Sequence, residues 1–317
     1  MRVSLYLRTT DYTDFTDKDK MIKKTKVFSF LLAGIRPDSL RGRDPCSSVV
    51  KKLPGFGELF FAMFVVTGLL GANAAQAAEP TLAEKLCSSY TQVESVSCRV
   101  RKTSEVDGKT ATLLSQVYYQ RPDRMHVENI APIRRRIIAD GRQFYYYVEG
   151  MAKGFSCPLT KLEGEWSIMQ KSVPGSAMEH LLRLKGVPEI PLDGVSDYPV
   201  RRGYARERVF VVLACDSEGR LARIEFFKTP EMKNLTAQVE YSDFKKVTDT
   251  CWLAGLQQGT AYFGANTVRE TRRFDNLIIN KPITAGLFDA AAFFPKVDFV
   301  DDFNKLTNEI PKQPQVK

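Results

Sequence analysis

Apolar and polar residues alternate along several segments of the chain after residue 94, and this alternation constrains the fold more than any other feature. In residues 95–101 (Ser-Val-Ser-Cys-Arg-Val-Arg) every second residue is apolar, and residues 235–241 repeat the pattern. Such alternation predicts β-strands that bury one face and expose the other to water. Turn signals, among them Asp107-Gly108 and Asp140-Gly141, separate the strands.

Two helices interrupt the predicted strands. One is expected from Thr81, because Thr81 and Glu84 have the spacing of a capping box. The other is expected over residues 176–185, where Ser176 and Glu179 repeat that spacing and Gly186 supplies a stop. Strands are expected at residues 95–101 and 113–120, consecutively through 117–148 between turns at 121–123 and 140–141, in short pieces within 153–169, and at 206–214, 221–228, 235–241, 251–260 and 266–278.

This order of elements predicts an α+β fold with one antiparallel sheet, because runs of strands are joined by turns and only a few helices are present. The domain is expected to span residues 78–308. Residues 309–317, which contain Pro311 and Pro314 among polar residues, are expected to form a disordered tail.

Residues 51–77 are expected to be a secretory signal peptide. Lys51 and Lys52 precede the apolar run Leu59–Leu70, and Ala-x-Ala cleavage candidates follow at residues 72–74 and 75–77. The run is shorter than the roughly 20 residues of a membrane-spanning helix. A buried core helix is the alternative. No cysteine closely follows the run, so we expect a soluble exported protein without a lipid anchor.

Residues 1–50 are unusual in front of a signal peptide. They are polar and mixed in charge, and too few apolar residues recur to build a core. We interpret them as a non-native or disordered extension that results from an overlong start assignment. A cytosolic N-terminal domain is the alternative.

The charge of the chain does not indicate a nucleic-acid-binding protein. The formal net charge is +9, but residues 1–77 hold 12 Lys/Arg and 7 Asp/Glu, so +5 of it lies there and only +4 in the remaining 240 residues. Five cysteines follow residue 77, an odd number, so at least one is free or pairs between chains. With only two histidines in the chain, a zinc site has few ligands, and we expect no metal and no cofactor.

Motifs of catalysis are missing from the sequence. It contains no Gly-x-Ser-x-Gly elbow and no phosphate-binding Gly-x4-Gly-Lys-Ser/Thr loop. His180 falls on the polar flank of the second predicted helix, where we expect a solvated side chain. Apolar and aromatic strand residues are abundant instead: Phe144 and Tyr146 are expected on one face of their strand, and Tyr145 and Tyr147 on the other. Alternation alone fits a filled core and an open cavity equally well.

Three motifs in order resemble the LolA/LolB-type family of periplasmic lipoprotein carriers. The first is Arg121-Pro122 after a strand, and the second is Ile138-Ala-Asp-Gly-Arg-Gln-Phe-Tyr-Tyr146. The third begins at Pro282-Ile-Thr-Ala-Gly-Leu-Phe288 and continues through Phe293-Phe-Pro295 to residues 297–302. The family's aromatic position four residues after the Arg is Met125 here, which is a departure from the pattern.

The resemblance implies a single curved antiparallel sheet that forms an unclosed β-barrel covered by helices, with a cavity for acyl chains. It implies that Arg121 holds a helical lid closed, and we expect residues 176–185 to be that lid. The expected ligand-binding residues are Arg121, Met125, Val127, Phe144, Tyr146, Met178, Leu181 and Leu182.

The function implied by the resemblance is that of a carrier rather than an enzyme. A monomer would take acylated lipoproteins from an inner-membrane release complex and deliver them to an outer-membrane acceptor. The alternative is a LolA-like envelope sensor or regulator that binds lipid or lipoprotein. The sequence does not say which lipoproteins are bound, nor how Cys87, Cys98, Cys157, Cys215 and Cys251 pair.

Overall fold

The structure is a computed structural model that describes residues 79–206, 208–264 and 266–307. From Thr81 onward, these residues belong to one compact unit. The expected extension (1–50), signal peptide (51–77) and tail (309–317) lie outside the described residues. Within the described part, no helix has the length and apolar character needed to cross a bilayer.

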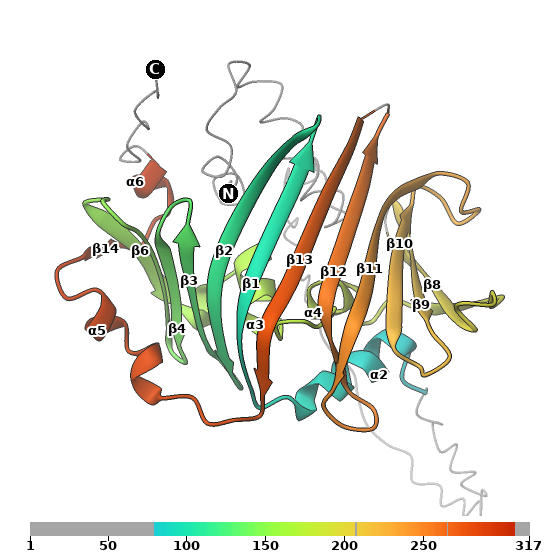
Figure 1. The fold of residues 1–317 in the computed structure, drawn as a ribbon, viewed down its shortest axis with the longest axis horizontal. Helices are drawn as coiled ribbons and strands as arrows, with labels where there is room; N and C mark the ends of the chain where they lie inside the picture. Colours follow the sequence, from blue (N-terminus) through green and yellow to red (C-terminus); the bar gives the residue numbers. More distant parts are fainter. Residues whose placement is uncertain (1–78, 207, 265, 308–317) are drawn as a thin grey trace, which may run out of the picture. The chain divides into compact units, whose positions relative to one another are not determined.

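One sheet of 14 strands dominates the fold (Figure 1), in the order β14-β6-β5-β4-β3-β2-β1-β13-β12-β11-β10-β9-β8-β7. Neighbours are antiparallel except for β14 and β6. The edge strands β14 and β7 do not pair with each other, so the sheet is unclosed, as expected. The strands are β1 (Ser95–Val106), β2 (Lys109–Gln120), β3 (Arg124–Ala131), β4 (Arg135–Asp140), β5 (Gln143–Val148), β6 (Lys153–Pro158), β7 (Glu189–Leu192), β8 (Val200–Arg206), β9 (Val209–Cys215), β10 (Leu221–Phe227), β11 (Leu235–Lys246), β12 (Trp252–Phe263), β13 (Asn266–Ile279) and β14 (Asp298–Val300).

The sheet consists of two meanders that run outward from a central pair, β1 and β13. Strands β1 to β6 follow one another on one side, and β13 back to β7 follow one another on the other. Because β6 and β7 lie toward opposite sides of the sheet, the chain between them must cross its width. That crossing carries helices, and it places them over one sheet face (Figure 1).

The helices are short. Thr81 caps the first as predicted: its Oγ1 accepts from the Glu84 N–H at 3.3 Å, and its own N–H donates to the Glu84 carboxylate at 3.0 Å. The α-helices are α2 (Leu82–Ser89), α3 (Gly164–Lys171), α4 (Met178–Leu181), α5 (Ala290–Phe293) and α6 (Asn304–Thr307), and the 3-10 helices are η3 (Tyr90–Gln92), η4 (Leu159–Lys161), η5 (Leu182–Leu184) and η6 (Ala285–Phe288).

Each sheet face has its own cover. We call the face that packs against α2, α3 and α4 the helix-covered face; it carries the apolar side chains that alternation predicted, such as Val96 and Cys98. The outer face of β3 to β5 is covered by the C-terminal segment, where Phe294 packs on Ile138 and Tyr145. The predicted split of the aromatic strand is confirmed, since Phe144 and Tyr146 lie on the helix-covered face and Tyr145 and Tyr147 on the outer face.

Two local predictions are wrong. Residues 153–169 do not remain extended: β6 ends at Pro158 and α3 follows, because the crossing chain packs Trp166 and Gln170, four residues apart, on the sheet. The capping box at Ser176 does not form either. Its hydroxyl donates to the Val173 carbonyl at 2.6 Å, and the predicted 176–185 helix is one turn of α-helix followed by η5.

Candidate ligand-binding site

An aromatic cluster lies between α3, α6 and strands β3 to β6 on the helix-covered face. Trp166 is its centre, with ring centroids 5.0 Å from Phe144 and 5.5 Å from Tyr146. Phe303, which follows β14 in the chain, completes the cluster, and its ring centroid lies 5.6 Å from that of Tyr146. Met125 joins the same cluster and is 3% exposed. The structure therefore brings together three of the residues that the sequence assigned to ligand binding.

A second, larger apolar cluster lies beneath α2 and α4. Leu181 is fully buried in it, and Met178 packs against it with a half-buried side chain. Val127 of β3 packs against both clusters. Leu182 is half-buried and lies in neither cluster, whereas Leu184, which the sequence analysis did not select, is 2% exposed within the larger one.

Arg121 lies in the turn between β2 and β3. Its backbone N–H donates to the Glu94 carbonyl at 2.9 Å. The half-buried guanidinium lies near Tyr119: burial raises the pKa of the Tyr119 hydroxyl, and the charge of Arg121 opposes that rise. Among the described residues, no hydrogen bond links the Arg121 side chain to a carbonyl of α3 or α4. Its role in holding a lid stays a prediction.

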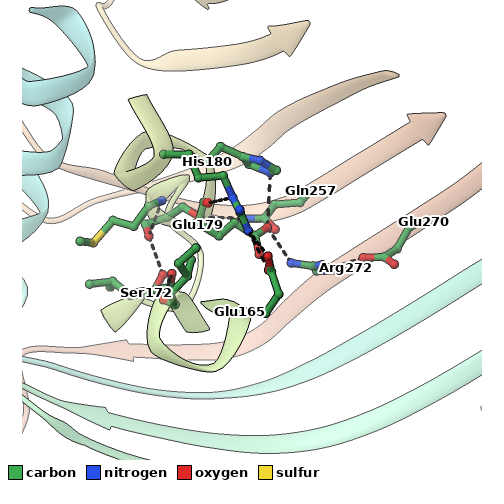
Figure 2. Close-up of polar contacts among 12 residues, drawn as sticks. Glu165, Ser172, Glu179, His180, Gln257, Glu270 and Arg272 are labelled. Atoms are coloured by element: carbon green, nitrogen blue, oxygen red, sulfur yellow. Dashed lines mark hydrogen bonds and ion pairs between the residues drawn. The ribbon is translucent and has the colours of Figure 1, made fainter. Parts of the chain in front are cut away.

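What connects α4 to the sheet is a network of charged side chains that the sequence analysis did not identify (Figure 2). Glu179 of α4 accepts from Arg272 of β13 at 2.8 Å, and Arg272 also donates to Glu270 at 2.7 Å. Lys102 of β1 lies 2.9 Å from the second Glu270 oxygen. Glu179, which the capping prediction assigned to the helix N-terminus, is therefore paired with the sheet instead.

Further polar contacts hold the segment around α4. Arg183 lies 2.7 Å from both Glu165 oxygens and so joins η5 to α3. The Gln257 amide donates to the Ser176 carbonyl at 3.1 Å, and the Ala254 N–H donates to the Gly175 carbonyl at 2.7 Å. The predicted solvated state of His180 is wrong. This side chain is 7% exposed, because it packs edge-on to Phe226 with centroids 5.7 Å apart.

The charges in this network stabilise one another. Burial would raise the pKa of the Glu179 carboxyl, but Arg272 and His180 outweigh burial and hold it well below its usual range. Burial likewise opposes ionisation of Glu270, and Lys102 and Arg272 bring its pKa below the usual value. The two carboxylates in turn raise the pKa of Arg272. Glu179, Glu270 and Arg272 are therefore ionised at neutral pH.

The sequence did contain a signal for this network. Along β1 the inward-facing positions run Val96, Cys98, Val100 and then Lys102. Glu270 and Arg272 similarly occupy inward-facing positions of β13. A charged residue at an inward-facing position of a strand needs a partner when the sheet face is covered. The alternation pattern alone therefore indicates that these charged residues have partners on the covered face.

The cysteines of the described residues are not activated thiols. Burial raises the pKa of the Cys98 and Cys215 thiols to about 12 and of the Cys87 and Cys251 thiols to about 11, so these four thiols are protonated at neutral pH. Cys157 is also unpaired, so the five cysteines of the described part form no disulfide. No group of three or more potential metal ligands occurs in the same part.

The sequence matches no family model and no curated protein. Solved structures similar to the chain include a domain described as an outer membrane lipoprotein-sorting protein from Vibrio parahaemolyticus, at TM-score 0.45 and 10% identity over 66% of this chain and 97% of that one. A DUF1329 family protein from Desulfovibrio piger follows at TM-score 0.44 and 10% identity, over 67% and 95%. A LolA superfamily protein from Nitrosomonas europaea aligns at TM-score 0.43 and 13% identity, over 67% and 97%. All three share 13% identity or less with this chain, so the function of the chain has to be argued from its own residues.

Proposed function

We propose that this protein is a periplasmic carrier that binds the acyl chains of lipoproteins between α4 and the helix-covered face of the sheet. It would receive them from an inner-membrane release complex and deliver them to an outer-membrane acceptor, acting as a monomer. The observation that supports this most directly is the short α4–η5 segment, which covers an apolar sheet face and is bounded by two glycines in the left-handed region.

Those glycines suit a segment that moves as a unit. Gly175 has φ +78°, and a Cβ there would lie 2.9 Å from the Ala254 carbonyl oxygen, so no other residue fits without a shift. Gly186 has φ +75° with open space around it. Between them, the segment is attached to the sheet by apolar packing, by the Glu179–Arg272 pair and by the hydrogen bond from Gln257 to the Ser176 carbonyl, and it is attached to α3 by Arg183.

An acyl chain can replace the apolar contacts of this segment at no net cost. Leu181 and Leu184 are 0% and 2% exposed, and exposing each costs about 1.5–3 kcal/mol, or roughly 3–6 kcal/mol together. Each buried CH₂ contributes about 0.8 kcal/mol, so about eight methylenes offset even the larger cost. A ligand with a longer acyl chain or with several acyl chains therefore favours the state in which the α4–η5 segment is displaced from the sheet.

The proposal is tested by what the purified protein binds. The full chain is delipidated, mixed with a synthetic triacylated lipopeptide, and analysed for bound lipopeptide by mass spectrometry of organic extracts. Leu181→Glu and Met125→Glu should abolish binding, because each places a carboxylate in a buried apolar cluster. Leu182→Glu is the matched control and should bind normally, because its neighbour Leu181, and not Leu182, contacts the cluster. Circular dichroism confirms that each variant is folded.

Absence of binding by the folded wild-type chain would refute the proposal. Carrier and sensor are distinguished in cells: depletion of a carrier leaves lipoproteins in the inner membrane. Depletion with unchanged delivery to the outer membrane would favour the alternative of an envelope sensor.

A further inference from the structure

A row of polar side chains crosses the otherwise apolar helix-covered face from β11 to β4. We call it the polar belt. In strand order, its members are Tyr241 (β11), Gln257 (β12), Arg272 (β13), Lys102 (β1), Ser115 (β2), Asn129 (β3) and Arg135 (β4). Each lies opposite its neighbour in the strand register, except that Ser115 pairs with Val100, one inward-facing position from Lys102.

The belt carries more positive than negative charge. Lys102, Arg272 and Arg135 are cations, and the carboxylates that contact the belt are Glu179 and Glu270, which leaves a net charge of +1. Arg135 is held by a neutral partner: the Asn129 amide oxygen accepts from its guanidinium, while the amide nitrogen donates to Ser115 Oγ at 2.8 Å. One further anion would neutralise the belt.

The centre of the belt is accessible to solvent. The side chains of Lys102 and Arg272 are 32% and 31% exposed. On the same strand as Lys102, Val96 and Cys98 are 0% and 1% exposed under the helices. On the other side of the belt, Val106 of the same strand and its partner Val268 are each 6% exposed, so the belt is a solvent-accessible polar row with buried apolar side chains on both sides.

The belt also has donors to spare. The Lys102 ammonium has three N–H donors, and one contact, to Glu270, is resolved among the described residues. The Tyr241 hydroxyl is buried and has no hydrogen-bond partner in the same part of the chain. Burial and the nearby Glu179 raise its pKa, so it keeps its proton and remains a donor.

We infer that Lys102 and Arg272 form a head-group subsite for an anionic amphiphile, whose acidic group lies at the belt while its acyl chain lies on the apolar face beneath α4. This deepens the proposed function and rests on it. A neutral ligand would require no excess cation beside the apolar surface, whereas a carboxylate or phosphate next to the chain forms charge-assisted hydrogen bonds with these donors.

The test compares ligands that share a chain and differ in charge. Dissociation constants of the full chain are measured for oleate against oleyl alcohol, and for monooleoyl lysophosphatidic acid against monooleoylglycerol. The wild type should prefer at least one anion by about tenfold, equivalent to about 1.4 kcal/mol. The pair with the larger ratio identifies the acidic group as a carboxylate or a phosphate.

Variants of adjacent residues on opposite faces locate the effect. Lys102→Gln should reduce the preference to about twofold or less, and Lys102→Arg, which retains the charge, should restore it. Arg101→Gln is the control, because this substitution removes the same charge from the outer face of the same strand. The Arg101 side chain is 58% exposed there. Thermal melts confirm folding, which is expected because Glu270 keeps Arg272 as a partner in Lys102→Gln.

The outcomes separate the two proposals. Equal binding of anionic and neutral ligands by the wild type overturns the subsite and leaves the proposed function intact. Equal losses in Lys102→Gln and Arg101→Gln also overturn the subsite, because the effect is then one of overall charge. Failure of all four ligands to bind overturns the subsite, and the function on which it rests is overturned as well only when the triacylated lipopeptide also fails to bind.

Discussion

The pair between Glu179 and Arg272 gives a prediction about how firmly α4 is held. Glu179→Gln removes the charge that α4 presents to the sheet while preserving the size of the side chain. The two side chains are 34% and 31% exposed, so the pair lies between a surface pair, worth up to about 1 kcal/mol, and a buried one, whose disruption costs about 3–5 kcal/mol. Because Arg272 keeps Glu270, we expect the cost to be about 1–2 kcal/mol.

Hydrogen exchange measures this cost locally. The amides of His180 and Leu181 both donate to the Ala177 carbonyl, at 2.9 and 3.1 Å, and exchange only when α4 opens. A loss of about 1–2 kcal/mol should accelerate their exchange by about 5- to 30-fold. Mass spectrometry of a peptide that spans residues 177–184 gives the rate.

The matched control is Glu240→Gln. Glu240 lies 2.7 Å from Arg223, and their side chains are 38% and 28% exposed, so the pair resembles Glu179–Arg272 in length and exposure but joins β10 to β11. It should leave exchange in residues 177–184 unchanged. If Glu179→Gln leaves α4 exchange at the wild-type rate, or if both variants accelerate it equally, the pair does not hold α4.

The pH dependence of this pair has a definite sign. The folded-state pKa of Glu179 lies below its ordinary value of 4.5, so the stabilisation is complete above pH 4.5 and is lost as pH falls through the lower folded-state pKa. Protection of α4 should therefore be the same at pH 7 and pH 5 once intrinsic exchange rates are corrected. A decrease between those values would contradict the assignment.

Three further predictions concern stability and release. Burial, reinforced by Arg136, lowers the pKa of His126 from 6.5 to about 4, so on acidification the unfolded state binds the proton before the folded state does. The free energy of unfolding should therefore fall by roughly 3 kcal/mol as the pH drops from 6.5 to 4. In denaturant titrations, His126→Phe should make this free energy less dependent on pH, and an unchanged pH dependence would show that His126 is not its cause. Leu181→Ala should destabilise the fold by about 2–5 kcal/mol in urea titrations, and the half-buried Leu182→Ala by less than about 1 kcal/mol; equal losses would contradict their different burial. Arg121→Leu should bind lipopeptide but fail to release it to an acceptor; normal transfer would argue against a role for Arg121 in holding the lid.

The sheet could be predicted from the sequence because its information is local. Alternation in residues 95–101 and 235–241 identifies both strand and buried face, and Asp107-Gly108, with φ of 50° and 74°, turns β1 into β2 as expected. The helix at Thr81 was predictable for the same reason, since a capping box is complete within four residues. Strand order was not predictable, because the central pairing of β1 with β13 joins distant parts of the chain.

The candidate site was predictable only in its apolar half. Phe144 and Tyr146 share a face by strand geometry, and this places them together on Trp166. The contact of Glu179 with Arg272 joins residues 93 positions apart, and nothing in the local pattern of Ser176–Glu179 distinguishes a capping box from an ion pair with the sheet. The exposure of His180 was predicted wrongly because the prediction assumed a helix over residues 176–185. The observed α-helix has four residues, which is too short to define a polar side.

The central position of β1 has a consequence for how the chain assembles. Its residue Val96 pairs with Tyr119 on one side and with Ile279 on the other. A chain that emerges N-terminus first at about 5–20 residues per second presents β13 roughly 7–30 s after β2 is complete. Throughout that interval, one edge of β1 lacks its permanent neighbour and exposes unpaired backbone groups to other chains. The pairing in the middle of the finished sheet, between β1 and β13, is thus among the last to form, followed only by that of the short β14 with β6. Aggregation during biogenesis should therefore depend more on β1 than on the strands at the finished edges.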